Sequence, residues 1–485
     1  MEDHMAKMFI AGESVDAISG ATYEVRNPAN GEVVDTAPKG NADDARRAID
    51  AAEAAFEEWS HTSAEDRGKL LFKAADLVAA ERKSLAELLC REQGKPFQEA
   101  SGELEHFDHG LHFYAGLASK VRGSHVPLPA KNAYGMVVHK PLGVCGAIVP
   151  WNFPLTLMGT KVGPALAAGN TVVVKPASTT PLATIRIIEL MNQAGIPKGV
   201  LNVITGPGSV VGEELLTNPK VRRIAFTGES ATGKHVASVA CGDFKRVTLE
   251  LGGSDPMIVC DDADVQKAIT GAMVGRFWNA GQACLAVKRL FLFDGVFDEF
   301  VQGLVSKVSR YEVGDGMTKA EKPKIRMGPL HTAAQRDEIE SQVKDAIDRG
   351  AKVLLGGARP EGAQYEKGHY YLPTILVDVP DDARAVQEET FGPMLPIFRV
   401  SSLDEAIEKA NASIYGLGSS IWTKNLDNIE TAIDRLQAGN VWVNSLHYGY
   451  DELPFGGVKA SGFGREHGPE ALDYYLEPKG VVITR

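Results

Sequence analysis

The sequence predicts an α/β protein with two lobes, each built on a mostly parallel sheet, and a small β arm. Three features of the 485-residue chain lead to this fold class. A single hydrophobic core stops growing near roughly 250–300 residues, so a longer chain divides into further domains. From about residue 144 onward, short apolar runs alternate with amphipathic helical stretches, as in repeated βαβ units. Two further strand-like segments belong to neither lobe.

The first lobe is predicted to begin with a helical layer. Residues 41–119 are rich in alanine and carry apolar residues at three- and four-residue spacing, which indicates amphipathic helices. A βα pattern follows, with strands expected at Val144–Val149, Thr171–Val174, Val200–Ile204 and Arg222–Phe226, and helices near 156–168, 181–194 and 209–217. Parallel pairing of these strands, with a helix crossing between them, predicts the first sheet.

The second lobe repeats the pattern and continues to Asn444. Its first elements are expected as strands at Pro256–Cys260 and Arg289–Phe293, helices at 263–275 and 296–309, and long loops at 314–329 and 356–373. The two segments outside the lobes are Lys131–Lys140 and Tyr474–Thr484. An exposed terminal strand usually pairs with another strand, so we expect these segments to pair across the subunits of a homodimer or homotetramer.

Composition and charge exclude several classes of protein. With 44% hydrophobic and 24% charged residues, the chain lies in the globular range. A net charge of -12 repels phosphate backbones, so nucleic acid is not an expected partner. Neither a leader in residues 1–30 nor an apolar stretch of the ~20 residues needed to cross a membrane is present in the sequence. Five scattered cysteines indicate free thiols in a reducing compartment, and we expect a cytoplasmic protein.

Cys284 and Glu250 are the first candidates for chemistry. A lone cysteine is more often an inert small hydrophobe than a nucleophile. The polar, glycine-containing approach Asn279–Gln282 predicts a loop or a helix start before Cys284, and a helix start would favour the thiolate. Glu250 ends an otherwise apolar strand, where a carboxylate is costly unless it is paired or functional. Each residue alone leaves the structural reading open.

Other motifs are weaker when they are taken alone. Asn152, in a rigid turn between Pro150 and Pro154, either forms the turn or offers an N–H to an oxyanion. Lys175 closes a strand, at the edge where open α/β sheets bind ligands. The histidines at 106, 109 and 112 resemble a metal motif, but the first and third lie roughly 120° apart around a helix. We therefore expect a solvated or packing role for them, and no metal.

Seven ordered blocks then connect the chain to a known family. They are Pro-Trp-Asn-Phe-Pro at 150–154, Lys-Pro-Ala-Ser at 175–178, Phe-Thr-Gly at 226–228, Glu-Leu-Gly-Gly at 250–253, Gly-Gln-Ala-Cys at 281–284, Glu-Glu-Thr-Phe-Gly-Pro at 388–393 and Pro-Phe-Gly-Gly at 454–457. Nearly the whole chain, from Asn27 to Glu466, resembles the aldehyde dehydrogenase superfamily, and specifically its NAD(P)-dependent, hydrolytic, non-acylating members.

The resemblance implies roles for the catalytic candidates. Cys284 is expected to be the nucleophile, Asn152 to hold the oxyanion together with the Cys284 backbone N–H, and Glu250 to be the general base. Lys161 and Glu466 match a proton relay towards that base. The expected reaction is oxidation of an aldehyde to its carboxylate through a thiohemiacetal and a thioester on Cys284.

The resemblance also implies NAD or NADP as the cofactor. Lys175 matches the lysine on the adenosine ribose, and Glu389 the carboxylate on the nicotinamide ribose. The other expected cofactor residues are Trp151, Ser178, Gly208, Gly228, Glu229, Leu251 and Phe391. Ser178 stands where strict NAD users often carry a glutamate, so NADP is admissible. Glu229 replaces the usual serine near the pyrophosphate, so its carboxylate is expected to turn away.

The substrate expectation rests on two missing arginines. Succinate-semialdehyde enzymes typically carry them where this chain has Trp278 and Thr160, so a distal carboxylate lacks its usual clamp. The expected pocket is an apolar tunnel, with His447, Tyr448 and Tyr450 at its mouth, and comprises Phe153, Leu157, Thr160, Trp278, Leu285, His447, Tyr448 and Phe455. We expect a neutral or hydroxylated aldehyde, similar to lactaldehyde or glyceraldehyde, or an aromatic one.

Three alternatives remain at this point. They are a succinate-semialdehyde-type dehydrogenase, a relative that acylates coenzyme A, and a non-catalytic protein that retains only the fold. Acylating relatives typically lack the base that Glu250 provides, and a scaffold has no reason to keep Cys284, Asn152 and Glu250 together. The expected domains are a cofactor domain at 1–118 and 141–252, a catalytic domain at 253–460, and an oligomerisation arm at 119–140 and 461–485.

Overall fold

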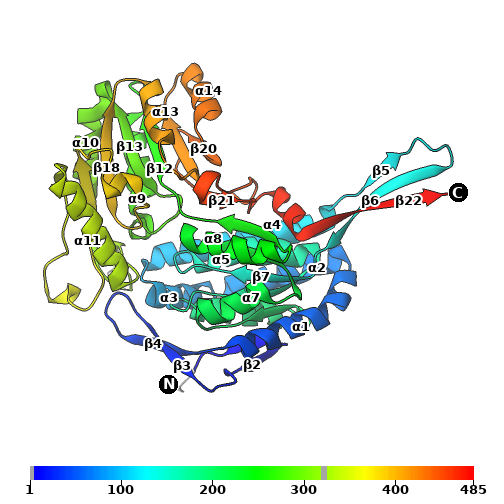
Figure 1. Cartoon of the computed structure of the whole chain (residues 1–485). Helices are drawn as coiled ribbons and strands as arrows, with labels where there is room; N and C mark the ends of the chain where they lie inside the picture. Colours follow the sequence, from blue (N-terminus) through cyan, green and yellow to red (C-terminus); the bar gives the residue numbers. More distant parts are fainter. Residues whose placement is uncertain (1–4, 318–324) are drawn as a thin grey trace.

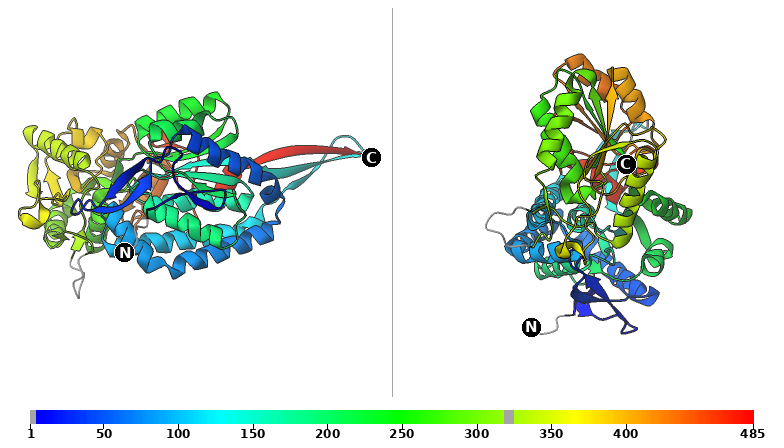
Figure 2. Two further views of the ribbon diagram at one scale, coloured as in Figure 1. Left: turned by 90° about the horizontal axis from the view of Figure 1, so that it is seen from below. Right: turned by 90° about the vertical axis from the view of Figure 1, so that its left-hand side faces the viewer.

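The computed structural model describes residues 5–317 and 325–485. It has two lobes, and a thin arm extends away from one of them (Figure 1). The left view of Figure 2 shows that the arm leaves the body of the molecule at one end, while the second lobe lies at the opposite end. The predicted fold class is confirmed. Of the predicted loop at 314–329, residues 318–324 lie outside the described part.

The first lobe is built on an eight-stranded sheet. Its strand order is β2 (Glu13–Val15), β1 (Met8–Ile10), β9 (Leu201–Val203), β8 (Thr171–Lys175), β7 (Val144–Ile148), β10 (Val221–Thr227), β11 (Arg246–Glu250) and β21 (Gly462–Phe463). The strands from β9 to β11 pair in parallel, and β1 and β21 join antiparallel. The predicted strands lie within two residues of those observed, whereas β1 and β2 were not expected. Their three-residue length is too short for a recognisable alternation.

Helices cover both faces of this sheet. They are α1 (Ala42–His61), α2 (Ala64–Ala80), α3 (Arg82–Gln93), α4 (Phe97–Leu117), α5 (Pro154–Ala168), α6 (Leu182–Gln193), α7 (Glu213–Thr217) and α8 (Ser230–Gly242). Successive strand residues face opposite sides, so in β8 Val172 and Val174 pack in the same core as residues of α2, α4 and α6, whereas Val173 packs in the core that includes residues of α1. The Asn41 side chain caps α1 in a capping box with Asp44. The segment predicted as a helix at 209–217 begins with a π-helical turn at Gly208–Gly212.

The second lobe contains a seven-stranded sheet. Its order is β16 (Lys352–Leu355), β17 (Thr374–Val377), β18 (Met394–Val400), β13 (Val287–Phe293), β12 (Asp255–Val259), β19 (Gly418–Trp422) and β20 (Asn440–Val443). Only the β16–β17 pair in this sheet is antiparallel. The helices of this lobe are α9 (Val265–Phe277), α10 (Asp294–Val308), α11 (Ala333–Asp348), α12 (Arg384–Gln387), α13 (Leu403–Asn411) and α14 (Leu426–Arg435).

The arm consists of three antiparallel strands. Their order is β22 (Leu476–Thr484), β6 (Ala133–Pro141) and β5 (Ser124–Pro127). We expected the segments at 131–140 and 474–484 to pair across subunits, but they pair with each other within the chain, from Leu476 opposite Pro141 to Thr484 opposite Ala133. The sequence pattern identifies two strands without fixing which strand each one joins. The outer edge of β22 has no partner strand among the described residues.

Two small sheets complete the fold. They are the hairpin of β3 (Thr22–Arg26) and β4 (Val33–Pro38), and the pair of β14 (Glu312–Val313) and β15 (Ile325–Met327). The described residues contain no helix that is long and apolar enough to cross a membrane.

Candidate active site

A cavity of about 600 Å³ leads from the surface to Cys284. Its deeper wall is apolar and includes Phe153, at 9% exposure, and Phe455, at 6%. Its outer part includes Tyr448 and Tyr450, which are 39% and 44% exposed. The remaining lining residues are Gly102, Glu103, Glu105, His106, His109, Thr156, Leu157, Trp278, Leu285, Gly449, Asp451, Glu452 and His467. A molecule that enters this cavity therefore meets polar groups first and an apolar wall next to the thiol.

Cys284 lies in a turn between a short 3-10 segment, Trp278–Gly281, and the start of β13. Of the two alternatives that the sequence left open, the loop is correct and the helix start is wrong. Two non-glycine residues of the 3-10 segment have left-handed backbone angles, with φ of 50° at Asn279 and 53° at Ala280. Burial raises the pKa of the Cys284 thiol to about 12, and the Lys288 ammonium opposes that shift. The thiol is therefore protonated near pH 7 until a base takes its proton.

Asn152 lies beside the Cys284 turn, between β7 and α5. Its side-chain Nδ2 donates to the Gln282 backbone carbonyl at 3.2 Å, and the backbone carbonyl of Asn152 accepts a hydrogen bond from Asn279 Nδ2 at 3.0 Å. Helix α5 begins directly after it, with Pro154 in the first turn, where the missing proline N–H costs nothing. A side-chain amide has two N–H groups, so Asn152 retains one donor.

Glu250 ends β11, and the residue is 3% exposed. Neither carboxyl oxygen has a hydrogen-bond partner among the described residues. Burial raises the pKa of Glu250 well above its usual value, Glu466 raises it further, and Lys161 and Arg465 act in the opposite direction. A buried carboxyl with a raised pKa and two free oxygens is suited to taking and releasing a proton.

Lys161 and Glu466 form the buried ion pair behind Glu250. Lys161 Nζ lies 2.7 Å from Glu466 Oε1 and donates to the Thr227 hydroxyl at 2.7 Å. The Thr160 hydroxyl donates to Glu466 Oε2 at 2.6 Å. The expectation that Thr160 lines the substrate pocket is therefore wrong, because its hydroxyl is directed to Glu466 and Thr160 does not line the cavity.

The expected cofactor residues lie at the carboxyl ends of parallel strands, where an α/β sheet binds its ligands. Lys175 ends β8; its Nζ donates to the Pro176 carbonyl at 2.9 Å, and burial lowers its pKa to about 8. The Ser178 hydroxyl donates to the Gly206 carbonyl at 3.0 Å. Trp151, Gly208, Gly228, Glu229 and Leu251 follow the ends of β7, β9, β10 and β11. Glu229 is exposed and does not cap α8 with its side chain.

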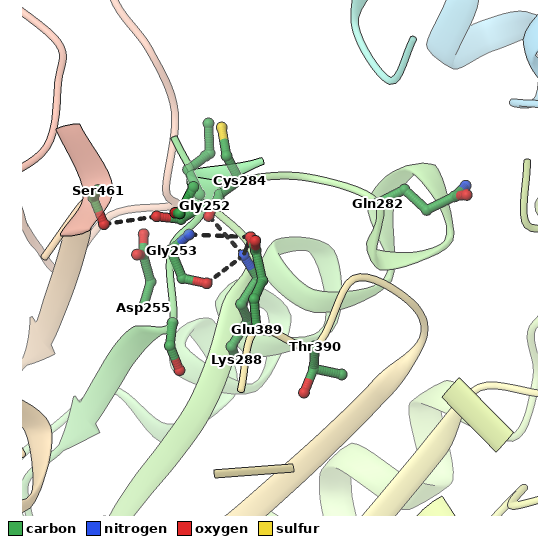
Figure 3. Close-up of polar contacts among 12 residues, drawn as sticks. Gly252, Gly253, Asp255, Gln282, Cys284, Lys288, Glu389, Thr390 and Ser461 are labelled. Carbon is green, nitrogen blue, oxygen red and sulfur yellow. Dashed lines mark hydrogen bonds and ion pairs between the residues drawn. The ribbon is translucent and has the colours of Figure 1, made fainter. Parts of the chain in front are cut away.

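Glu389 and Phe391 reach the same region from the second lobe. Glu389 Oε1 accepts hydrogen bonds from the Gly253 N–H at 3.0 Å and from Lys288 Nζ at 2.7 Å (Figure 3). The Phe391 ring contacts the Trp151 ring edge-on, with 5.6 Å between the ring centroids. Trp151 also stacks on His331, a residue that the sequence analysis did not identify. Glu389 and Phe391 therefore contact Gly253 and Trp151, and Lys288 connects Glu389 to the carbonyl of Cys284.

Comparison with known proteins decides the family. The sequence profile of the aldehyde dehydrogenase family matches residues 15–481. The chain belongs to the aldehyde dehydrogenase family. It is 42% identical to a betaine aldehyde dehydrogenase of Bacillus subtilis, over 98% of this chain and 96% of that one. It is 40% identical to the NADP(+) succinate-semialdehyde dehydrogenase GabD of Escherichia coli, over 98% and 97%.

A solved structure extends the comparison. The crystal structure of betaine aldehyde dehydrogenase from Staphylococcus aureus, in complex with NAD⁺, is 37% identical and superposes with a TM-score of 0.95, over 99% of this chain and 95% of that chain. The protein described here is an NAD(P)-dependent aldehyde dehydrogenase. Among its described residues, no group of three histidine, cysteine, aspartate or glutamate side chains is arranged to hold a metal ion.

One expectation for the substrate site of this aldehyde dehydrogenase needs correction. His447 is not at the cavity mouth: it is 6% exposed, stacks on Trp442, and is held between the Leu285 carbonyl and the Ser420 hydroxyl at 3.0 and 2.7 Å. His106 and His109, for which we expected a solvated or packing role, also line the cavity, and the His109 side chain is 59% exposed. The His106 ring stacks on Tyr448, and Tyr448 Oη lies 3.0 Å from its Nδ1.

Lys288 is the main residue that the sequence analysis missed. It lies in the predicted second lobe, next to the start of the expected strand at Arg289–Phe293, and its side chain is 1% exposed. Lys288 and Arg289 are two charged residues at the beginning of an otherwise apolar run, a signal similar to the one that identified Glu250. This signal did not lead to a prediction for Lys288, because most lysines lie on the surface.

Proposed function

We propose that this aldehyde dehydrogenase oxidises uncharged aldehydes, hydroxylated or aromatic, to carboxylates through a thioester on Cys284. The observation that carries the proposal is the position of Cys284: it lies at the apolar end of a cavity, close to Asn152 and to the unpartnered carboxyl of Glu250. Among the described residues, no arginine or lysine lines that cavity. A distal carboxylate on the substrate would therefore find no arginine or lysine to bind it.

The first chemical step is addition of the thiol to the aldehyde. Glu250 takes the Cys284 proton, the sulfur adds to the carbonyl carbon, and the oxygen becomes an oxyanion. The free N–H of Asn152 and the Cys284 backbone N–H are suited to hold it, and one such donor is worth roughly 3–4 kcal/mol. Bound cofactor supplies the acceptor for the hydride that leaves this carbon.

Thioester hydrolysis is the second step. Glu250 takes a proton from water, whose oxygen adds to the acyl carbon, and the carbon–sulfur bond breaks to release the carboxylate and the Cys284 thiolate. General-base catalysis of this kind contributes typically 10²–10⁴-fold. The buried Lys161–Glu466 ion pair lies near enough to Glu250 to change its pKa, and it is suited to accept the proton that Glu250 releases. This step separates the proposal from a coenzyme A-acylating activity.

The described residues fit a nicotinamide dinucleotide. Lys175 uses one of its donors on Pro176, and a Cβ added at Gly208 meets nothing within 4 Å. Lys175 and Ser178 would hold the adenosine ribose, Gly208, Gly228 and Leu251 would line the groove, and Trp151, Glu389 and Phe391 would surround the nicotinamide end. Glu229 is exposed and can turn away from phosphate. Either NAD or NADP fits, because residue 178 is a serine and has no carboxylate to repel a 2′-phosphate.

We further propose the division into cofactor domain, catalytic domain and oligomerisation arm given above, and self-association through the arm. Support comes from the open edge of β22 and from Val482, which is 69% exposed on it. An unpaired edge with an exposed valine is suited to contact a second subunit.

A panel of aldehydes assayed with NAD and with NADP tests the substrate class. It should include lactaldehyde, glyceraldehyde, benzaldehyde, betaine aldehyde and succinate semialdehyde, with and without coenzyme A. We expect the highest kcat/KM for an uncharged aldehyde, no requirement for coenzyme A, and no activity in Cys284→Ala. Preference for succinate semialdehyde would contradict the proposed class. Full activity of Cys284→Ala would contradict the mechanism.

A further inference from the structure

Lys288 places a buried ammonium group behind Cys284. Its Nζ donates to the Cys284 carbonyl at 2.8 Å and to the Gly253 carbonyl at 2.8 Å, and it lies 2.7 Å from Glu389 Oε1 (Figure 3). An ammonium group has three N–H donors, so all of them are used. The side chain is 1% exposed and that of Glu389 is 18% exposed, so water screens this pair far less than it screens a surface pair.

These contacts join three segments that are distant in sequence. They are the turn that carries Cys284, the loop that follows Glu250 between β11 and β12, and the loop after α12 that carries Glu389. The segments are tightly packed: a Cβ added at Gly253 would lie 2.8 Å from the Cys284 carbonyl oxygen, and one added at Gly252 would overlap the Glu389 carboxylate. Without Lys288, two carbonyls and a carboxylate would lose a buried donor.

The charges around the thiol give Lys288 a second effect. Burial raises the pKa of Cys284, the Lys288 ammonium lowers it, and the carboxylates of Glu250, Asp255 and Glu389 raise it. Lys288 therefore supplies a positive charge that acts on the Cys284 thiol against three carboxylates. Replacing it by a neutral side chain leaves the carboxylates unopposed, so the pKa of Cys284 would rise.

We propose that Lys288 is a positioning residue, which holds the Cys284 turn against Glu389 and supplies the positive charge that favours the Cys284 thiolate. The proposal rests on the proposed function, in which Cys284 is the nucleophile and Glu389 contacts the cofactor. It predicts that one substitution changes two properties together, the reactivity of the thiol and the affinity for the cofactor.

Alkylation of Cys284 by iodoacetamide, followed over pH, measures the first property without turnover. Cys241 is exposed and would also be alkylated, so it should be replaced by serine in every variant. Cys90, Cys145 and Cys260 are buried and can remain. Titration with NAD, followed by protein fluorescence, measures the second property. The variants are Lys288→Met, Lys288→Arg and Lys288→Met combined with Glu389→Gln.

Lys245→Met is the matched control. Lys245 is also buried and donates to two backbone carbonyls, those of Asn218 and Val221, at 2.6 and 3.0 Å. It lies at the start of β11, opposite to the end that carries Glu250. Its removal tests for a general effect of losing a buried lysine.

In Lys288→Met we expect alkylation near neutral pH to be roughly tenfold slower, and NAD affinity to fall by about the same factor. Lys288→Arg should keep an alkylation rate near the wild-type value. The alkylation rate of the double variant should lie between those of Lys288→Met and wild type, because it also removes an opposing carboxylate. Lys245→Met should change neither property.

Two outcomes overturn the proposal. One is a Lys288→Met protein with the wild-type alkylation profile and NAD affinity. If that protein does not fold, equal alkylation rates near neutral pH in Lys288→Arg and the double variant have the same consequence. Neither readout depends on turnover, so failure of the proposed function is recognised separately, by an active Cys284→Ala enzyme.

Discussion

Replacing Glu250 by glutamine separates the two halves of the proposed reaction. The amide has nearly the same shape as the carboxyl but cannot accept a proton from water. Neither carboxyl oxygen has a hydrogen-bond partner among the described residues, so the change breaks no contact there. Loss of general-base catalysis of 10²–10⁴-fold corresponds to about 3–5 kcal/mol in the barrier to thioester hydrolysis. Steady-state turnover should fall by that factor.

Stopped-flow absorbance at the wavelength of reduced nicotinamide is the assay. With excess aldehyde and cofactor, Glu250→Gln should release a burst approaching one reduced cofactor per active site, and then turn over slowly. Cys284→Ala is the control and should give no burst. Because Glu250 also takes the thiol proton in the first step, the burst itself should be slower than in wild type, and raising the pH should restore it. Undiminished steady-state turnover in Glu250→Gln would refute the reasoning.

The pH dependence of folding stability gives an independent check on Glu250. Its pKa is raised in the folded protein, so the folded state holds its proton more tightly than the unfolded chain does. The associated stability is present at low pH and is lost as the pH rises through the raised pKa. Glu250→Gln removes this loss, so its Tm relative to wild type should increase with pH across that range. A Tm difference independent of pH would contradict the burial effect.

Two further substitutions and one deletion test the other proposals. Ser178→Glu places a carboxylate near the expected 2′-phosphate and should weaken NADP binding by roughly ten- to hundredfold while sparing NAD binding. The measurement is the ratio of kcat/KM for the two cofactors, and an unchanged ratio would mean that cofactor choice is set elsewhere. Deletion of residues 479–485 removes most of β22 and should yield monomers in sedimentation velocity, whereas an unchanged assembly would exclude the arm as the contact. Trp278→Arg adds a cation to the cavity and should raise kcat/KM for succinate semialdehyde relative to benzaldehyde; no gain would argue that the distal group never reaches residue 278.

The sequence predicts most of the fold because its strands are buried on both faces. All five residues of β8 and of β12 are buried, and such apolar runs are recognisable without knowledge of their neighbours. The short N-terminal strands were missed for the opposite reason: β2 is mostly exposed and has three residues. Intrachain pairing of β6 with β22 could not be predicted either, because register between distant segments depends on the whole fold.

The candidate site divides in the same way. Cys284, Asn152 and Glu250 lie in sequence blocks that a family resemblance identifies, and the fold brings those blocks together. Thr160, in α5, was assigned to the cavity because succinate-semialdehyde enzymes typically carry an arginine there, and His447 from its place in the chain; both side chains have other partners. Chain position does not determine the direction of a side chain, so the substrate pocket was the least predictable part. Lys288 could have been identified from its apolar surroundings, but its contacts could not.

The pairing of β6 with β22 has a consequence for synthesis of the protein. Residues 133–141 leave the ribosome early, and their partner at 476–484 is made much later. At a synthesis rate of about 5–20 residues per second, β5 and β6 exist for on the order of tens of seconds before β22 is made and can pair with β6. During that interval a polysome carries several nascent chains with the same open strand, each able to pair with a neighbour's. The charged and polar side chains around β5 and β6, among them His125, Lys131, His139 and Lys140, are suited to keep those chains apart until β22 arrives.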